Sequence, residues 1–310
     1  MSKLLKAVEK AKRNKRIEEN ESWIAKGDSH VEPLEVEDSI IEAIPVSKQM
    51  PKANAKTCVA GPYCNVTKDN EKDGTSCMVP SSFFKDDLVL DELNLAKNRI
   101  LTRNSSPMFT DIYNLLRTQI LHRTKKKGHN VLMVTSAMPG EGKTITSINL
   151  AISLAREVDQ FALLVDTDMR DPSIHKYLGI EVERGLTDHL LHDIPVPDLL
   201  IKPGINKLSF LPAGDPIRGS TEILGSPKLQ DLIIEMKERY PDRYVIFDCP
   251  DLLHAPDALV FSSYVDGIIF VVEAGKTSRE NVQKAMNLLE GRNVVGVVLN
   301  KTDKESLDVK

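Results

Sequence analysis

Beyond residue 107, the sequence alternates short apolar runs with stretches of helical periodicity. Most of these runs lack the in-and-out alternation of half-exposed strands, as expected for strands that helices cover on both faces. The alternation predicts a doubly wound α/β domain with a mostly parallel sheet. The expected strands are Val131–Thr135, Phe161–Val165, Leu208–Leu211, Tyr244–Phe247, Gly267–Val272 and Val294–Leu299. The expected helices cover residues 143–157, 226–239, 256–264 and 278–290.

The first 105 residues differ from the rest in composition. Residues 3–16 carry seven Lys or Arg and apolar residues at helical spacing, which predicts a short amphipathic helix. An acidic stretch follows over residues 18–42, and a polar stretch broken by Pro, Gly, Asn and Ser then reaches Pro107. Such composition is typical of linkers. We therefore expect two parts, a largely flexible region over residues 1–105 and a folded domain over residues 106–310.

The charge balance and the lack of long apolar runs exclude several classes of protein. The chain carries 41 Lys and Arg against 45 Asp and Glu, and a nucleic-acid binder usually has a basic surplus, so we expect no nucleic-acid partner. No apolar run approaches the roughly 18 residues of a transmembrane helix, and none follows the basic N-terminus as in a secretory signal. We expect a cytoplasmic protein. The spacing of Cys58, Cys64 and Cys77 does not resemble a zinc ribbon, and their role stays open.

A phosphate-binding pattern follows the first expected strand directly, where residues 137–144 read Ala-Met-Pro-Gly-Glu-Gly-Lys-Thr. It matches G-x-x-x-x-G-K-[ST] except at its first position, which is alanine here. The two glycines allow the loop to direct several N–H groups at phosphate oxygens. Lys143 adds a positive charge, Thr144 offers a hydroxyl to Mg²⁺, and the N-terminus of the following helix attracts the same anion. The expected phosphate-binding residues are Pro139, Gly140, Glu141, Gly142, Lys143, Thr144 and Ile145.

Two further expected strands end in acidic residues. Asp166 and Asp168 follow the apolar run 161–165, and Asp248 follows the run 244–247. Open α/β sheets bind their ligands at the carboxyl ends of strands, and alternate residues at a strand end point to the same side. The position of Asp248 is that of a Walker B carboxylate, which holds Mg²⁺ directly or through water. The sequence therefore predicts a Mg-nucleotide site, with metal ligands Thr144, Asp166 and Asp248.

Two of these segments carry a resemblance to a known family. Residues 163–172 read Leu-Leu-Val-Asp-Thr-Asp-Met-Arg-Asp-Pro, and residues 245–250 read Val-Ile-Phe-Asp-Cys-Pro. They resemble the second Walker motif and the Walker B segment of bacterial tyrosine kinases. The resemblance covers residues 108–303 and is greatest to the cytoplasmic autokinases encoded with exopolysaccharide export systems. Residues 1–10 are also similar to the exosortase-associated branch. The implied fold is a P-loop NTPase of the MinD/ParA-like type.

The resemblance implies ATP and Mg²⁺ as cofactors and a tyrosine hydroxyl as the phosphate acceptor. Lys143 would stabilise the transferring phosphoryl group, Asp166 would accept the tyrosine proton, and Asp168 would assist at the metal and the phosphates. Asn300, at the end of the last expected strand, is a further nucleotide-binding candidate. A carboxylate base suits this chemistry because a tyrosine hydroxyl, with a pKa of about 10, is a poor nucleophile at neutral pH.

The resemblance also implies partners. A membrane-bound polysaccharide chain-length or export adaptor protein would activate the enzyme at the inner face of the plasma membrane, through the basic N-terminal helix or residues 108–127. Homo-oligomers form in this family through a helix with the motif Glu-x-x-Arg-x-x-Arg. Only Arg117 of that motif is present here, so homo-oligomerisation stays open. The family carries acceptor tyrosines in its C-terminal tail, but no tyrosine follows Tyr264, so we expect a protein tyrosine substrate or Tyr63 of the predicted linker.

Three other functions stay open. A switch ATPase of the MinD/ParA type is disfavoured because Met138 stands where that class has its signature lysine. A GTPase is suggested by Asn-Lys-Thr-Asp at residues 300–303, but no D-x-x-G motif follows Asp248. The third is a nucleotide-binding regulator of polysaccharide export with impaired kinase activity. Asp251 replaces the second proline of the family's Walker B segment, and its effect is open.

Overall fold

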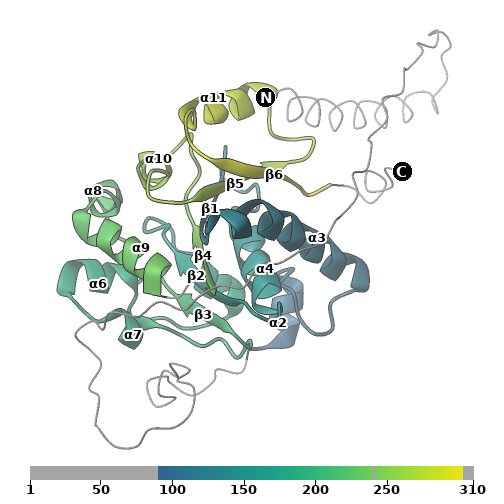
Figure 1. Cartoon of the computed structure of the whole chain (residues 1–310), viewed down its shortest axis with the longest axis horizontal. Helices are drawn as coiled ribbons and strands as arrows, with labels where there is room; N and C mark the ends of the chain where they lie inside the picture. The colour runs from purple at the N-terminus through teal and green to yellow at the C-terminus, as the bar shows by residue number, and fades with distance from the viewer. Residues whose placement is uncertain (1–89, 240–241, 303–310) are drawn as a thin grey trace, which may run out of the picture. The chain divides into compact units, whose positions relative to one another are not determined.

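A six-stranded parallel sheet forms the centre of the domain (Figure 1). The computed structural model describes residues 90–239 and 242–302, so the expected N-terminal helix, the acidic stretch and Cys58, Cys64 and Cys77 lie outside the described part. The strands are ordered β3-β2-β4-β1-β5-β6. They are β1 (Val131–Ser136), β2 (Phe161–Asp166), β3 (Leu208–Leu211), β4 (Arg243–Asp248), β5 (Gly267–Glu273) and β6 (Val294–Asn300). Each expected strand is present to within one residue at either end, and the doubly wound α/β prediction is confirmed.

Helices cover both faces of this sheet. Those of the described residues are α2 (Glu92–Lys97), α3 (Pro107–Thr124), α4 (Lys143–Ala155), α5 (Ile174–Leu178), α6 (Leu186–His192), α7 (Val196–Leu199), α8 (Ser220–Leu224), α9 (Pro227–Arg239), α10 (Pro256–Phe261) and α11 (Arg279–Leu288). The four helices expected from the sequence are α4, α9, α10 and α11. None of the helices in the described part is both long enough and apolar enough to cross a bilayer.

The core consists of two apolar clusters, one on each face of the sheet. In β1, Val131 and Met133 belong to the cluster under α9, α10 and α11, while Leu132 and Val134 belong to the cluster under α3 and α4. All four side chains are fully buried. Burial on both faces explains why the apolar runs in the sequence lack polar alternation. In Figure 1 the two sets of helices lie on opposite sides of the sheet.

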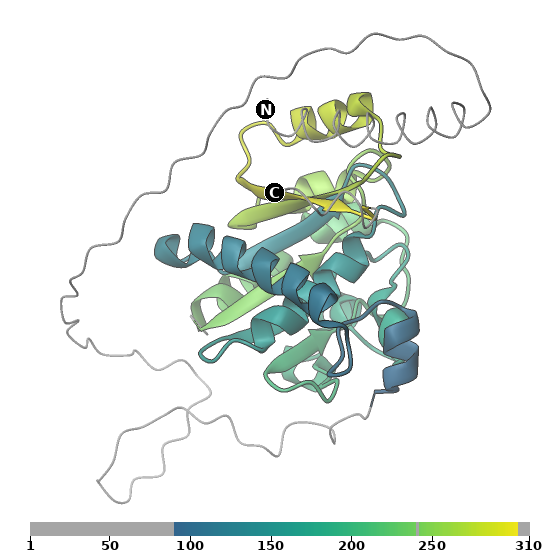
Figure 2. The same cartoon turned by 90° about the vertical axis from the view of Figure 1, so that its right-hand side faces the viewer.

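Residues 90–105 are part of the domain, although the expected boundary placed them in the linker. Leu95 and Leu101 are buried in the cluster under α3 and α4. Asn149 in the middle of α4 accepts a hydrogen bond from the N–H of Leu101 (2.7 Å) and donates one to the carbonyl of Arg99 (2.9 Å). Figure 2 shows α2 close to one end of α3. The segment between α2 and α3 is therefore hydrogen-bonded to the middle of α4.

Candidate active site

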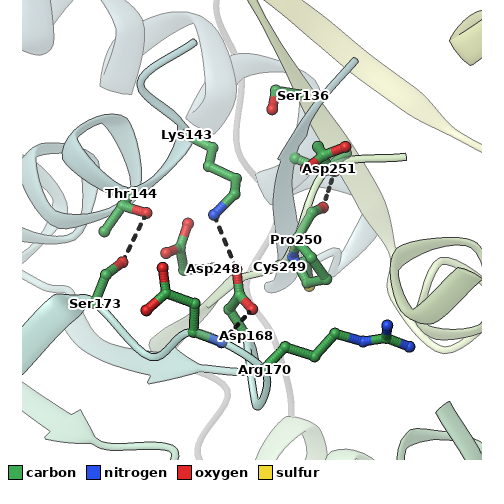
Figure 3. A network of polar contacts seen from close by, with 12 residues as sticks. Ser136, Lys143, Thr144, Asp168, Arg170, Ser173, Asp248, Cys249, Pro250 and Asp251 are labelled. Atoms are coloured by element: carbon green, nitrogen blue, oxygen red, sulfur yellow. Dashed lines mark hydrogen bonds and ion pairs between the residues drawn. The ribbon is translucent and has the colours of Figure 1, made fainter. Parts of the chain in front are cut away.

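The carboxyl ends of three neighbouring strands meet at one edge of the sheet. β4 lies between β2 and β1, and Asp166 at the end of β2 is aligned with Asp248 at the end of β4. The loop that follows β1 leads into α4, whose first residue is Lys143. Figure 3 shows Lys143 extending toward Asp168, with Asp248 beside them. The structure thus brings together the lysine and the carboxylates that the sequence distributes over three strand ends.

The phosphate loop has the backbone that its glycines predict. Gly140 and Gly142 have φ values of 79° and 96°, in the left-handed region that side chains rarely adopt. A Cβ atom at Gly142 would also lie 2.0 Å from Nδ2 of Asn300. Gly142 is the N-cap of α4, so the unpaired N–H groups of the first helical turn follow it directly. Pro139 is exposed, and Ile145 is half-buried and packs on the core.

The side chain of Glu141 is buried within this loop. Its Oε2 accepts hydrogen bonds from the N–H groups of Ala137 (2.8 Å) and Met138 (3.0 Å), and its Oε1 accepts one from the hydroxyl of Thr277. Both carboxylate oxygens therefore hold the loop together. Only the backbone N–H of Glu141 is left to bind a phosphate, a distinction that the sequence pattern does not make.

Lys143 remains charged in this surrounding. Its Nζ donates a hydrogen bond to Oδ2 of Asp168 at 3.1 Å. Burial disfavours the ammonium group, but the charges of Asp248, Asp168 and Asp166 outweigh burial and raise the pKa of Lys143 above its ordinary value. The lysine therefore carries a positive charge, and its Nζ can bind a phosphate oxygen in place of Asp168.

Asp166 is fully buried and serves as the anchor of the loop after β2. Its Oδ1 accepts a hydrogen bond from the N–H of Asp168 (3.1 Å), and its Oδ2 accepts from the N–H groups of Ser173 (3.1 Å) and Ile174 (3.2 Å). Burial and the nearby charge of Asp248 raise the pKa of Asp166 to about 8, against the lowering effect of these N–H donors. A carboxyl group with such a pKa suits proton transfer near neutral pH.

Asp248 offers a free oxygen to a cation. Its Oδ1 accepts a hydrogen bond from the hydroxyl of Ser147 (2.9 Å), but its Oδ2 is buried and has no hydrogen-bond partner. Burial raises the pKa of Asp248. With Asp166, Asp168 and the hydroxyl of Thr144, the site holds the oxygen donors that Mg²⁺ prefers. Within the described ranges, no group of three His, Cys, Asp or Glu side chains is arranged so that it could hold a metal ion by itself.

Comparisons with known proteins agree with this geometry. A family model described as an AAA domain matches residues 129–293, just over half of the chain. Tyrosine-protein kinase YwqD of Bacillus subtilis is 30% identical over 208 residues, which cover 66% of this chain and 86% of that protein. The chain belongs to the bacterial tyrosine-kinase family.

Two further matches extend the comparison. The solved kinase domain of the Escherichia coli tyrosine kinase ETK is 26% identical, with a TM-score of 0.60, and the match covers 70% of this chain and 89% of that domain. The succinoglycan biosynthesis transport protein ExoP of Rhizobium meliloti is 34% identical over 182 residues, which cover 57% of this chain but 23% of ExoP. The kinase resemblance and the P-loop NTPase fold expected from the sequence are thus confirmed.

An ion pair next to the kinase site escaped the sequence analysis. Asp257, in the first turn of α10, is fully buried, and its two oxygens accept hydrogen bonds from Nε (3.0 Å) and Nη2 (2.8 Å) of Arg170. The hydroxyls of Ser220 and Thr221 donate to the same carboxylate. Burial alone would raise the pKa of Asp257, but these hydrogen bonds hold it below the ordinary value. The pair binds the loop after Asp168 to α8 and α10.

Removal of Arg170 is expected to destabilise the kinase domain. Arg170→Met leaves the buried carboxylate of Asp257 with two hydroxyl donors and no counter-charge, and we expect the free energy of unfolding to fall by about 2 kcal/mol. Urea denaturation measures this change. Lys176→Met is the matched control because the Lys176–Asp171 pair is exposed, and it should cost about 0.5 kcal/mol or less. Equal effects of the two variants would contradict a structural role for Arg170.

The raised pKa of Asp166 predicts how stability depends on pH. Between the ordinary carboxyl pKa of about 4 and a pKa of about 8, the folded state keeps a proton that the unfolded state releases. This group therefore lowers the free energy of unfolding as pH rises through that range. Asp166→Asn should flatten the decline, and urea denaturation between pH 5 and 8 in the presence of a chelator measures it. Identical slopes for the two proteins would show that Asp166 is ionised throughout.

Asp251, which replaces the second proline of the family's Walker B segment, is hydrogen-bonded to His254. Oδ2 of Asp251 accepts hydrogen bonds from the backbone N–H (3.1 Å) and from Nδ1 (2.6 Å) of His254. Figure 3 shows Asp251 beyond Pro250, on the side away from Asp168. Asp303, which the GTPase alternative requires, lies outside the described residues.

Proposed function

We propose that this chain is a protein-tyrosine kinase that transfers the γ-phosphate of Mg-ATP to a tyrosine hydroxyl and regulates exopolysaccharide biosynthesis and export. The observation that carries the proposal is the convergence of Lys143, Asp166, Asp168 and Asp248 beside a phosphate loop. Membership of the bacterial tyrosine-kinase family supports the reaction. The similarity to the succinoglycan biosynthesis transport protein ExoP supports the role in exopolysaccharide biosynthesis and export.

In the proposed reaction, the loop N–H groups and Lys143 would bind the phosphate oxygens, and Thr144, Asp166 and Asp248 would hold Mg²⁺. The bound cation would neutralise charge on the phosphates. The tyrosine oxygen attacks the γ-phosphorus, the bond to the β–γ bridging oxygen breaks, and ADP leaves. With the cation bound, its charge would keep Asp166 ionised, so that Asp166 could accept the phenolic proton, while Asp168, released from Lys143, would assist at the phosphates. Because the reaction needs positioning and charge neutralisation above all, these few groups suffice.

The acceptor tyrosine comes from another protein or from the N-terminal region in this proposal. Tyr113 and Tyr244 are buried in the core and cannot reach a phosphate. Tyr177 and Tyr264 are half-buried, and the hydroxyl of Tyr264 accepts a hydrogen bond from Gln230. Tyr63, the candidate from the sequence, and Tyr240 lie outside the described residues.

A membrane-bound export adaptor is the proposed activator. The similarity to ExoP, a succinoglycan biosynthesis transport protein, supports a link between this kinase and an export system. Residues 108–127 are the proposed contact, because α3 exposes Met108, Ile112 and Leu115 on one side and is followed by three lysines. Such a contact would hold the kinase at the inner face of the plasma membrane.

Phosphosite mass spectrometry tests the proposal. The purified full chain is incubated with Mg-ATP, with and without the proposed export adaptor, and all tyrosines of both proteins are examined. Phosphotyrosine that requires Mg²⁺ and increases with the adaptor is the expected result. Release of ADP without phosphotyrosine would instead favour the switch ATPase.

A further inference from the structure

The end of β6 is hydrogen-bonded to the phosphate loop. Nδ2 of Asn300, the last residue of the strand, donates to the carbonyl of Glu141 at 2.8 Å. Nζ of Lys301, the next residue, donates to the carbonyl of Gly140 at 2.7 Å. Two consecutive residues of one segment thus bind two consecutive carbonyls of the other, although 161 positions separate Lys301 from Gly140 in the sequence.

The backbone of Lys301 supports a specific role for its side chain. Its φ value of 57° lies in the left-handed region, which is unfavourable for a residue with a Cβ atom. Unfavourable backbone of this kind persists where surrounding contacts require it. Here the ammonium group has two acceptors, the carbonyl of Gly140 and Oε2 of Glu273 at 3.1 Å.

The planarity of the peptide bond connects these contacts to phosphate binding. In a trans peptide the C=O and the following N–H point in opposite directions. A carbonyl of Gly140 directed at Lys301 therefore directs the N–H of Glu141 away from β6. In the same way, the bond from Asn300 to the carbonyl of Glu141 orients the N–H of Gly142. Both N–H groups belong to the loop that would enclose the phosphates.

We infer that Lys301 is a positioning residue for the nucleotide phosphates, an inference that rests on the proposed function. Lys301 does not touch the phosphates; it holds the Gly140–Glu141 peptide in the orientation in which its N–H can donate to a phosphate oxygen. Glu273, whose side chain is only 13% exposed, holds the lysine in place. Loss of the ammonium should therefore weaken nucleotide binding more than it slows the chemical step.

Separate substitutions of the two lysines that pair with Glu273 distinguish this role from a general loss of positive charge. Lys276 also pairs with Oε2 of Glu273, at 3.3 Å, but it is the more exposed lysine and belongs to the turn after β5. Lys301→Met and Lys276→Met each remove one lysine from Glu273, and only the first removes the bond to Gly140. Lys301→Arg keeps a donor and should restore part of the function.

The test measures nucleotide affinity with a fluorescent ATP analogue, together with kcat and KM for phosphoryl transfer, on the full chain. We expect Lys301→Met to raise Kd and the KM for ATP about tenfold, as for loss of a charge-assisted hydrogen bond, while kcat changes less than about threefold. Lys276→Met should stay within about twofold of the wild type in Kd. Thermal unfolding without nucleotide should be the same for both variants.

An unchanged Kd for Lys301→Met would overturn the inference. Equal weakening of nucleotide binding by Lys276→Met would also overturn it, because the unpaired charge of Glu273 would then be the cause. So would a Lys301→Arg variant that binds the nucleotide no better than Lys301→Met. If the wild type binds the analogue but transfers no phosphate, the proposed function fails, while the affinity comparison still decides the role of Lys301.

Discussion

Lys143→Met should reduce phosphoryl transfer by about 10³-fold, which corresponds to about 4 kcal/mol of transition-state stabilisation. Lys143 keeps its positive charge because Asp248, Asp168 and Asp166 raise its pKa, and a thioether cannot replace that charge at the phosphates. The three carboxylates would also lose their nearest counter-charge. Transfer of labelled γ-phosphate to tyrosine, measured at saturating Mg-ATP, gives the loss.

Lys176→Met is the control for this variant. Lys176 is an exposed lysine that pairs with Asp171 on the loop after β2, so its loss removes a positive charge near the site without touching the phosphate loop. Its transfer rate should equal that of the wild type. Circular dichroism must show that Lys143→Met is folded. A folded Lys143→Met protein with wild-type activity would refute the assignment of the site.

Asp248→Asn should abolish the dependence of nucleotide binding on Mg²⁺. The unpartnered Oδ2 of Asp248 is the free acceptor in the buried part of the site, and an amide carries no charge to hold a divalent cation. Ser147 can still donate to the remaining oxygen, so we expect the fold to be retained. Transfer should fall by about 10²-fold or more. Titration of Mg²⁺ into the protein with a fluorescent nucleotide measures the effect.

Asp171→Asn is the matched control for Asp248→Asn. The side chain of Asp171 is 83% exposed and contacts Lys176, so its neutralisation removes one negative charge from the same region of the molecule. Mg²⁺ should tighten nucleotide binding to this variant as it does for the wild type. If Asp248→Asn responds to Mg²⁺ in the same way, the cation is held elsewhere.

The strands and the positions of the site residues were predictable from the sequence for a physical reason. Buried strands need continuous apolar runs, and parallel strands place their carboxyl ends at one edge, so Lys143, Asp166 and Asp248 could be assigned to one site before any coordinates. The helices α2, α3 and α5 to α8 were not expected from the sequence. The helices α5 to α8 have four to seven residues each, fewer than two turns, and α3 buries only Tyr113, Ile120 and Thr124 of its 18 residues, so none of them shows a clear apolar period.

Contacts between segments that are far apart in the sequence were the second feature that the sequence could not predict. The burial of Asp257 depends on Arg170 and α8, and the packing of residues 90–105 depends on the amide of Asn149. The role of the Glu141 carboxylate depends on Thr277, which follows it by 136 positions. In each case a polar residue satisfies groups far away in the sequence, and no local pattern records such a partner.

The hydrogen bonds of Asn149 connect α4 to the segment that precedes α3. The first residue of this helix is Lys143 of the phosphate loop, and its middle is hydrogen-bonded to the backbone of Arg99 and Leu101. The helix that presents the phosphate-binding lysine is therefore also the helix to which residues 99–101 are fixed.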